Sequence, residues 1–165
     1  RDLSYFGEFG KQGLGYQVAY LRAQLESILH ADQEWHLAVI GAGALGHALV
    51  NYRTFRRWKY CIQAVFDNDP QKIGQPIGSG PTNGLVIQPM SELHDTIREK
   101  HIEIAIIAVP AEYAQEVAEQ LVAGGVRAIL NYAPINLTLP PGVHVSYSDP
   151  VVNLQSITYY LQGSD

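Results

Sequence analysis

The sequence predicts an α/β fold, built as a doubly wound, mainly parallel sheet with helices on both faces. Short apolar runs such as LAVI and IEIAIIAV alternate with amphipathic segments of about ten residues. Apart from Glu103 these runs are apolar, and strands without polar alternation are typical of parallel sheets buried on both faces. With 165 residues, 47% of them hydrophobic, the chain can bury the core of one such domain.

The predicted elements follow one another in a regular order. Strands are expected at LAVIG, CIQAVFD, LVIQP, IEIAIIAVP and VRAILN, and a last short one over residues 143–147. Helices are expected over residues 44–52, 91–100, 112–123 and 151–161. Ser91 is a plausible cap of the second helix, and Gly124-Gly125 a stop signal for the third.

Four parts of the chain are distinguished by composition and periodicity. Residues 1–16 are rich in aromatic residues and glycine and have no periodic pattern, whereas residues 17–34 have the apolar spacing of a connector helix. Residues 35–149 contain the alternating strands and helices, and residues 150–165 are expected to form a C-terminal helix.

A glycine-rich segment, Gly41-Ala42-Gly43-Ala44-Leu45-Gly46, has the spacing G-x-G-x-x-G between a predicted strand and a predicted helix. In that context the pattern is typical of dinucleotide binding by a Rossmann-like domain. The first glycine permits the tight turn, the second lets a pyrophosphate approach the backbone, and the third allows the helix to pack closely on the sheet. A plain glycine turn without a ligand is the alternative.

Asp67 ends the next strand, twenty-one residues after Gly46. A carboxylate at this position can accept hydrogen bonds from the adenosine ribose and repels a 2′-phosphate, and no Arg or Lys follows before Lys72. The sequence therefore predicts NAD(H) as the cofactor in preference to NADP(H). Asp69 could do the same, but its place before Pro70 favours a turn.

The nicotinamide is expected at the ends of later strands, at Val109-Pro110 and beside Tyr132. None of the six histidines lies at such a strand end, and no tyrosine is followed by lysine four positions later. No histidines or carboxylates cluster at metal-ligand spacing. We therefore expect no catalytic residue and no metal, and a nucleotide that serves as a signal.

The charge and cysteine content restrict the possible partners. A formal net charge of −5 argues against broad binding to nucleic acid or membrane, and no apolar stretch is long enough to cross a bilayer. Cys61 is the single cysteine of the sequence, so no internal disulfide is expected. The sequence does not begin with a leader peptide, and a cytoplasmic protein is expected. The basic and aromatic residues 53–60 either cap a helix and cover the sheet edge or bind nucleic acid.

Several segments together resemble the Rex-type redox-sensing transcriptional repressors. The opening RDLSYFGEFGKQGLGY, then VIGAGALGHAL, FDNDP, IEIAIIAVP and ILNYAP, and a terminal helix after Ser148-Asp149 all fit that family. The resemblance covers essentially the whole chain. RDLSYFG is its most specific part, because generic dinucleotide-binding folds lack it.

The resemblance implies a homodimer whose C-terminal helix exchanges onto the partner subunit. It identifies residues 1–16 as the end of the recognition helix and the wing of a winged-helix domain, most of which is absent here. Only the full-length protein would bind operator DNA, and NADH would release it from the DNA. NAD+ would compete with NADH for the cofactor site. Tyr52 and Asp149 would respond as a pair to reduced cofactor across the dimer, and Asp67 would bind the ribose.

Two positions depart from the family pattern, and two other functions stay open. Ala44 stands where the family often has Arg or Asn, and Pro150 where an apolar residue is usual. The alternatives are a fragment of a nicotinamide-dependent oxidoreductase and a CoA-binding domain of the acyl-CoA ligase type. Asp67 favours NAD over CoA, and the missing acid or base favours a sensor over an enzyme.

Overall fold

The computed structural model describes residues 33–79 and 84–162. The chain divides into two compact units, Arg1–Glu34 and Trp35–Asp165. Almost all of the first unit, including the predicted winged-helix remnant and connector helix, lies outside the described residues.

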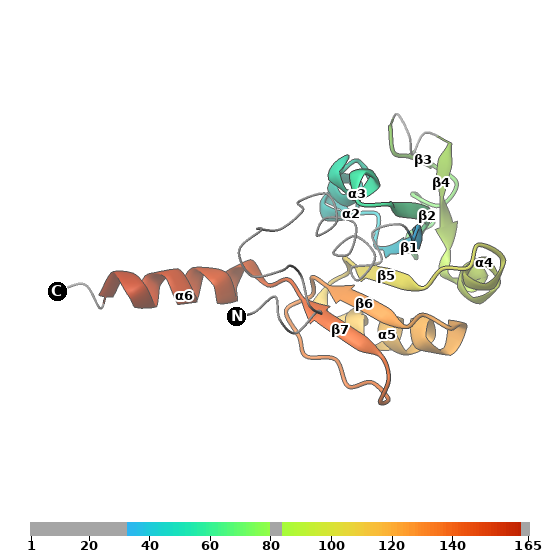
Figure 1. Ribbon diagram of the computed structural model, residues 1–165. Coiled ribbons are helices and arrows are strands. Elements are labelled where there is room, and N and C mark those ends of the chain that lie inside the picture. The colour runs from blue at the N-terminus through green and yellow to red at the C-terminus, as the bar shows by residue number, and fades with distance from the viewer. Residues whose placement is uncertain (1–32, 80–83, 163–165) are drawn as a thin grey trace, which may run out of the picture. The chain divides into compact units, whose positions relative to one another are not determined.

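The described residues of this unit form seven strands and six helical segments (Figure 1). The strands are β1 (Trp35–Ile40), β2 (Tyr60–Asp67), β3 (Pro76–Ile77), β4 (Leu85–Pro89), β5 (Ile104–Ile107), β6 (Ala128–Asn131) and β7 (His144–Tyr147). The helices are α2 (Ala44–Val50), α3 (Thr54–Arg57), the 3₁₀ turn η3 (Met90–Glu92), α4 (Leu93–Glu99), α5 (Ala111–Gly124) and α6 (Pro150–Gln162).

The strands form one sheet in the order β3-β4-β2-β1-β5-β6-β7. Every neighbouring pair is parallel except β3–β4. The strand order reverses at β1, whose neighbours are β2 on one side and β5 on the other. In open sheets of this kind, ligands bind at the carboxyl ends of the strands where the order reverses. The predicted doubly wound, mainly parallel sheet is confirmed.

Alternate residues of β1 enter two separate apolar cores. Ala38 and Ile40 join the core under α4 and α5, whereas Leu37 and Val39 join the core under α2. In Figure 1, α2 and α5 correspondingly lie on opposite sides of the sheet. All four side chains are almost fully buried, which explains why residues 37–40 of the strand are all apolar.

Three local features differ from the prediction. The two-residue strand β3 was not predicted, because a run of two residues has no period to detect. Ser91 does not cap α4: it lies inside η3, which follows Pro89, and α4 begins only at Leu93. The stop at Gly124-Gly125 is confirmed, since Gly125 ends α5 with a φ of 110°.

The basic and aromatic segment contains an additional short helix. Arg56 and Arg57 lie in the last turn of α3, where cations are favourable, but α2 ends earlier, at Val50. Phe55 packs on the core under α2, while Trp58 is 61% exposed. Among the described residues, no helix has the length and apolar character to span a membrane.

Candidate functional site

The turn from β1 into α2 requires glycine at its first position. Gly41 has a φ of 103°, and its N–H donates to the carbonyl of Phe66 on the neighbouring strand at 2.8 Å. A Cβ at this position would lie 2.5 Å from the carbonyl oxygen of Ala108, at the end of β5. The loop is thus packed between β2 and β5, at the point where the strand order reverses.

The other two glycines serve different purposes. A Cβ on Gly46 would lie 1.9 Å from the carbonyl oxygen of Gly41, so the start of α2 can approach the loop only because this residue is glycine. A Cβ on Gly43 would meet nothing within 4 Å. Gly43, Ala44 and Leu45 are exposed, so this part of the loop is open to a ligand such as a pyrophosphate.

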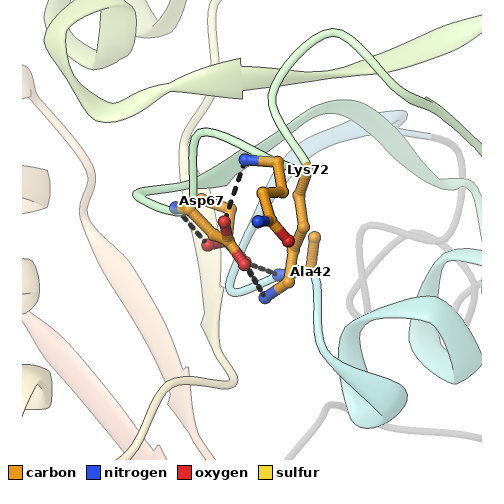
Figure 2. A network of polar contacts seen from close by, with 5 residues as sticks. Ala42, Asp67 and Lys72 are labelled. Atoms are coloured by element: carbon orange, nitrogen blue, oxygen red, sulfur yellow. Dashed lines mark hydrogen bonds and ion pairs between the residues drawn. The ribbon is translucent and has the colours of Figure 1, made fainter.

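Asp67 is tied to the glycine loop by its side chain. Its Oδ2 accepts hydrogen bonds from the Ala42 N–H at 2.8 Å and from Lys72 Nζ at 3.1 Å, and its Oδ1 accepts one from the Asp69 N–H at 2.9 Å. The side chain is 13% exposed. Figure 2 shows the Ala42 amide and the Lys72 ammonium group reaching the carboxylate from different sides. The carboxylate therefore borders the loop on which the pyrophosphate is expected.

The surroundings of Asp67 keep it ionised. Burial disfavours the charge and raises the pKa of Asp67, but hydrogen bonds from Asp69, Ala42 and Lys72 outweigh burial and hold the pKa below its ordinary value. A lowered pKa in the folded state means that this carboxylate stabilises the fold above its ordinary pKa. That contribution is lost as the pH falls through the lower value.

The strand ends beyond β1 contribute a buried amide and a half-buried ring. The side chain of Asn131 donates to the carbonyls of Ala133 and Ile135 and accepts from the Ala133 N–H, which fixes the turn after β6. Tyr132 packs half-buried on the core under α2. After β5, Val109 is half-buried and Pro110 is exposed as the residue before α5. The structural role of Asn131 was not predicted; an Asn as the last residue of a strand was its only sequence signal.

Tyr52 and Asp149 have separate contacts within this chain. Tyr52 is 55% exposed and packs edge-to-face on Phe55, with ring centroids 5.2 Å apart. Asp149 Oδ1 accepts the Val151 N–H at 2.8 Å and so caps α6, of which Pro150 is the first residue. Within the part of the single chain that the structure describes, the two side chains form no hydrogen bond with each other.

The predicted site residues thus fall into two groups. The glycine loop, Asp67 and the end of β5 are joined by direct contacts at one edge of the sheet. Tyr52 follows α2 and Asp149 precedes α6, and neither side chain contacts that group through a hydrogen bond that the structure shows. Over residues 33–79 and 84–162, no three His, Cys, Asp or Glu side chains are grouped so that they could hold a metal ion.

Comparison with known proteins identifies the family of the chain. The sequence profile of the CoA binding domain family matches residues 32–135. The redox-sensing transcriptional repressor Rex of Roseiflexus sp. (strain RS-1) is 52% identical over 98% of this chain and 71% of its own length.

Two solved structures of RSP, a Rex-family repressor, have the same fold over nearly the whole chain. The complex with β-NAD+ and operator DNA matches with a TM-score of 0.90 at 33% identity, over 98% of this chain and 72% of that one. The complex with β-NADH matches with a TM-score of 0.83 at 31% identity, over 98% and 73% of the two chains. The chain therefore belongs to the Rex family of redox-sensing transcriptional repressors, and its residues 32–135 belong to the CoA binding domain family.

Proposed function

We propose that this chain is the NAD(H)-sensing part of a cytoplasmic transcriptional repressor that responds to the ratio of NADH to NAD+. The main observation behind the proposal is the hydrogen bond between the Asp67 carboxylate and Ala42 in the glycine loop. The contact supports the proposal, because NAD-binding Rossmann domains depend on a carboxylate that accepts from the ribose beside a loop that binds the pyrophosphate. The names of the Rex relatives, and the β-NAD+ and β-NADH complexes of RSP, support the same cofactor.

In this proposal the dinucleotide lies along the carboxyl edge of the sheet, and NADH releases the full-length dimer from operator DNA. The adenosine is bound by Asp67 and the pyrophosphate by the loop, and the nicotinamide lies near the ends of β5 and β6. The proposed contact residues are Gly41, Ala42, Gly43, Ala44, Leu45, Gly46, Tyr52, Asp67, Val109, Pro110, Tyr132 and Asp149. The protein acts as a regulator, as its relatives do, and not as an oxidoreductase.

Competition between the two redox forms tests the sensing function. NADH fluorescence should change on titration with the protein and saturate, and added NAD+ should reverse the change at higher concentration than NADH itself needs. The reason is that a sensor must bind both forms at one site with different affinities. Saturable NADH binding that NAD+ never displaces would contradict a ratio sensor.

CoA is the second candidate ligand, because the family profile that matches residues 32–135 is described as CoA binding. CoA and NAD share an adenosine diphosphate unit, so the glycine loop alone does not separate them. CoA carries a 3′-phosphate on its ribose, next to the position that Asp67 would occupy. The ionised carboxylate therefore favours the unphosphorylated ribose of NAD.

The exposed apolar side chains of α6 lead to a prediction about assembly. Val151, Val152, Leu154 and Ile157 are each more than half exposed. We expect a partner subunit to cover them, since an apolar helix face of this length favours association. The chain should be a homodimer in light scattering, and a chain ending at Asp149 should be monomeric or aggregated. A monomeric full chain at micromolar concentration would overturn this prediction.

A substitution at Asp149 is expected to affect discrimination between the two redox forms. NADH and NAD+ differ only in the nicotinamide ring, which is cationic when oxidised, so contacts to adenosine and pyrophosphate cannot distinguish them. We propose that Asp149 meets the partner's cofactor and pairs with Tyr52 only when NADH is bound. Replacing Asp149 should reduce the ratio of NADH to NAD+ affinity by about tenfold or more, the scale of one hydrogen bond to a charged group, and leave NAD+ binding nearly intact.

The cap on α6 has to be separated from this effect. Asp149→Ala would remove both the carboxylate and the acceptor for the Val151 N–H, whereas Asp149→Ser keeps a capping oxygen and removes only the charge. In calorimetry, both variants should show the same reduction in the ratio of NADH to NAD+ affinity. An unchanged affinity ratio in Asp149→Ser would remove Asp149 from the sensing mechanism.

A further inference from the structure

The cation beside Asp67 has no role in the proposal so far. Lys72 Nζ lies 3.1 Å from Asp67 Oδ2 and 3.8 Å from Asp69 Oδ2, and the Lys72 side chain is 40% exposed (Figure 2). Backbone bonds from the Lys72 and Ile73 N–H groups to the Asp69 carbonyl fix the turn that presents the side chain. A positive charge therefore lies directly against the carboxylate that is expected to select the ribose.

The carboxylate has little capacity left for a ligand. An ionised carboxylate offers about four acceptor positions. Ala42, Asp69 and Lys72 occupy three of them in this structure. A ribose with two free hydroxyls needs two, so one of the three donors has to withdraw. Ala42 and Asp69 donate from the backbone and are fixed, whereas Lys72 is a flexible, partly exposed side chain.

We propose that Lys72 is a specificity-determining residue of the dinucleotide site, which leaves Asp67 when the ribose binds and sets how strongly a 2′-phosphorylated dinucleotide is rejected. The inference rests on the proposed function. A ribose hydroxyl takes the place of the ammonium group at Asp67, and the displaced ammonium group stays close to that hydroxyl. When the ligand carries a 2′-phosphate at that position, the same ammonium forms a charge-assisted hydrogen bond with the phosphate and offsets its repulsion by Asp67.

Among the described residues, Lys72 is the one cation in an ion pair with Asp67. Without this charge, a 2′-phosphate would face Asp67 and Asp69 with no compensation. The sequence position alone suggests an exclusion of NADPH by Asp67. The ion pair implies a weaker exclusion, which removal of Lys72 would strengthen.

The test compares NADH and NADPH binding by the whole chain, with fluorescence titration of the wild type, Lys72→Met and Lys72→Arg. Lys72→Met should raise the ratio of the NADPH to the NADH dissociation constant by about tenfold, with NADH binding not weakened. Lys72→Arg keeps the charge and should keep the ratio within about threefold. Arg98→Gln removes a surface ion pair with Asp95, far from Asp67 along the chain, and should leave both ligands unaffected.

The outcomes separate the two proposals. If the wild type binds NADH and Lys72→Met weakens both dinucleotides equally, or leaves their ratio unchanged, Lys72 has at most a structural role and this inference is wrong. If the wild type binds neither NADH nor NADPH, the proposed function is wrong as well.

Discussion

Gly46→Ala is expected to destabilise the fold by about 3 kcal/mol, at the upper end of the usual cost of overpacking. The added Cβ would lie 1.9 Å from the Gly41 carbonyl oxygen, and neither backbone can give way without moving the turn between β1 and α2. In an ordinary helix interior the same change would stabilise by about 1 kcal/mol. Urea denaturation followed by circular dichroism measures the difference. A variant as stable as the wild type would show that α2 does not pack as closely as described.

Gly43→Ala is the matched control within the same loop. Its Cβ would meet nothing within 4 Å, and its φ of −83° is ordinary for any residue. The free energy of unfolding should therefore change by less than about 1 kcal/mol, the usual range for a change between glycine and alanine at a helix cap. NADH binding should weaken at least tenfold, because the methyl group would occupy the space proposed for the pyrophosphate. Unaltered NADH binding would place the phosphates elsewhere.

Asp67→Ala is expected to have the largest effect on ligand choice. Hydrogen bonds to a charged group contribute about 1.5–3 kcal/mol, so NADH affinity should fall about tenfold to a hundredfold. The affinity for NADPH should fall less, because its 2′-phosphate no longer meets the Asp67 carboxylate and Lys72 is free to pair with the phosphate. Fluorescence titration with both dinucleotides measures the two changes. NADPH binding to the unmodified protein as tightly as NADH would refute the assignment of Asp67.

Asp69→Ala controls for the loss of one carboxylate in the same turn. Asp69 Oδ1 accepts the Gln71 N–H at 2.9 Å, and the side chain is more exposed than that of Asp67. We expect its replacement to loosen the turn and to leave the preference between NADH and NADPH within about threefold of the wild type, as for an exposed pair. An effect equal to that of Asp67→Ala would transfer the ribose role to Asp69.

The sheet was predictable because its strands are buried on both faces. Ile40, Phe66 and Ile107 are adjacent in register and almost completely buried, as are most of the residues just before them, so the buried part of each strand is apolar. The short elements could not be predicted because they are too short to have a pattern. The strand β3 has two residues and the turn η3 has three, and segments of this length have no periodicity.

The glycine loop and Asp67 were predictable because the turn and the carboxylate have residue-specific requirements. Gly41 has a φ that other residues rarely adopt, and Asp67 follows at the usual distance along the chain. The ion pair of Asp67 with Lys72 was not predicted, because the sequence shows only that Lys72 is the first cation downstream of Asp67. Its approach depends on the turn formed by residues 68–72, whose geometry the sequence does not specify.

Calorimetric titration of the whole chain with NADH, NAD+, NADPH and CoA tests the central claim most directly. Our account predicts one NADH per chain, bound more tightly than NAD+ and NADPH, with CoA failing to compete. The reason lies in the open loop at Gly43 and the ionised Asp67 beside it. CoA binding in preference to NADH, or no heat with any of the four ligands, would contradict it.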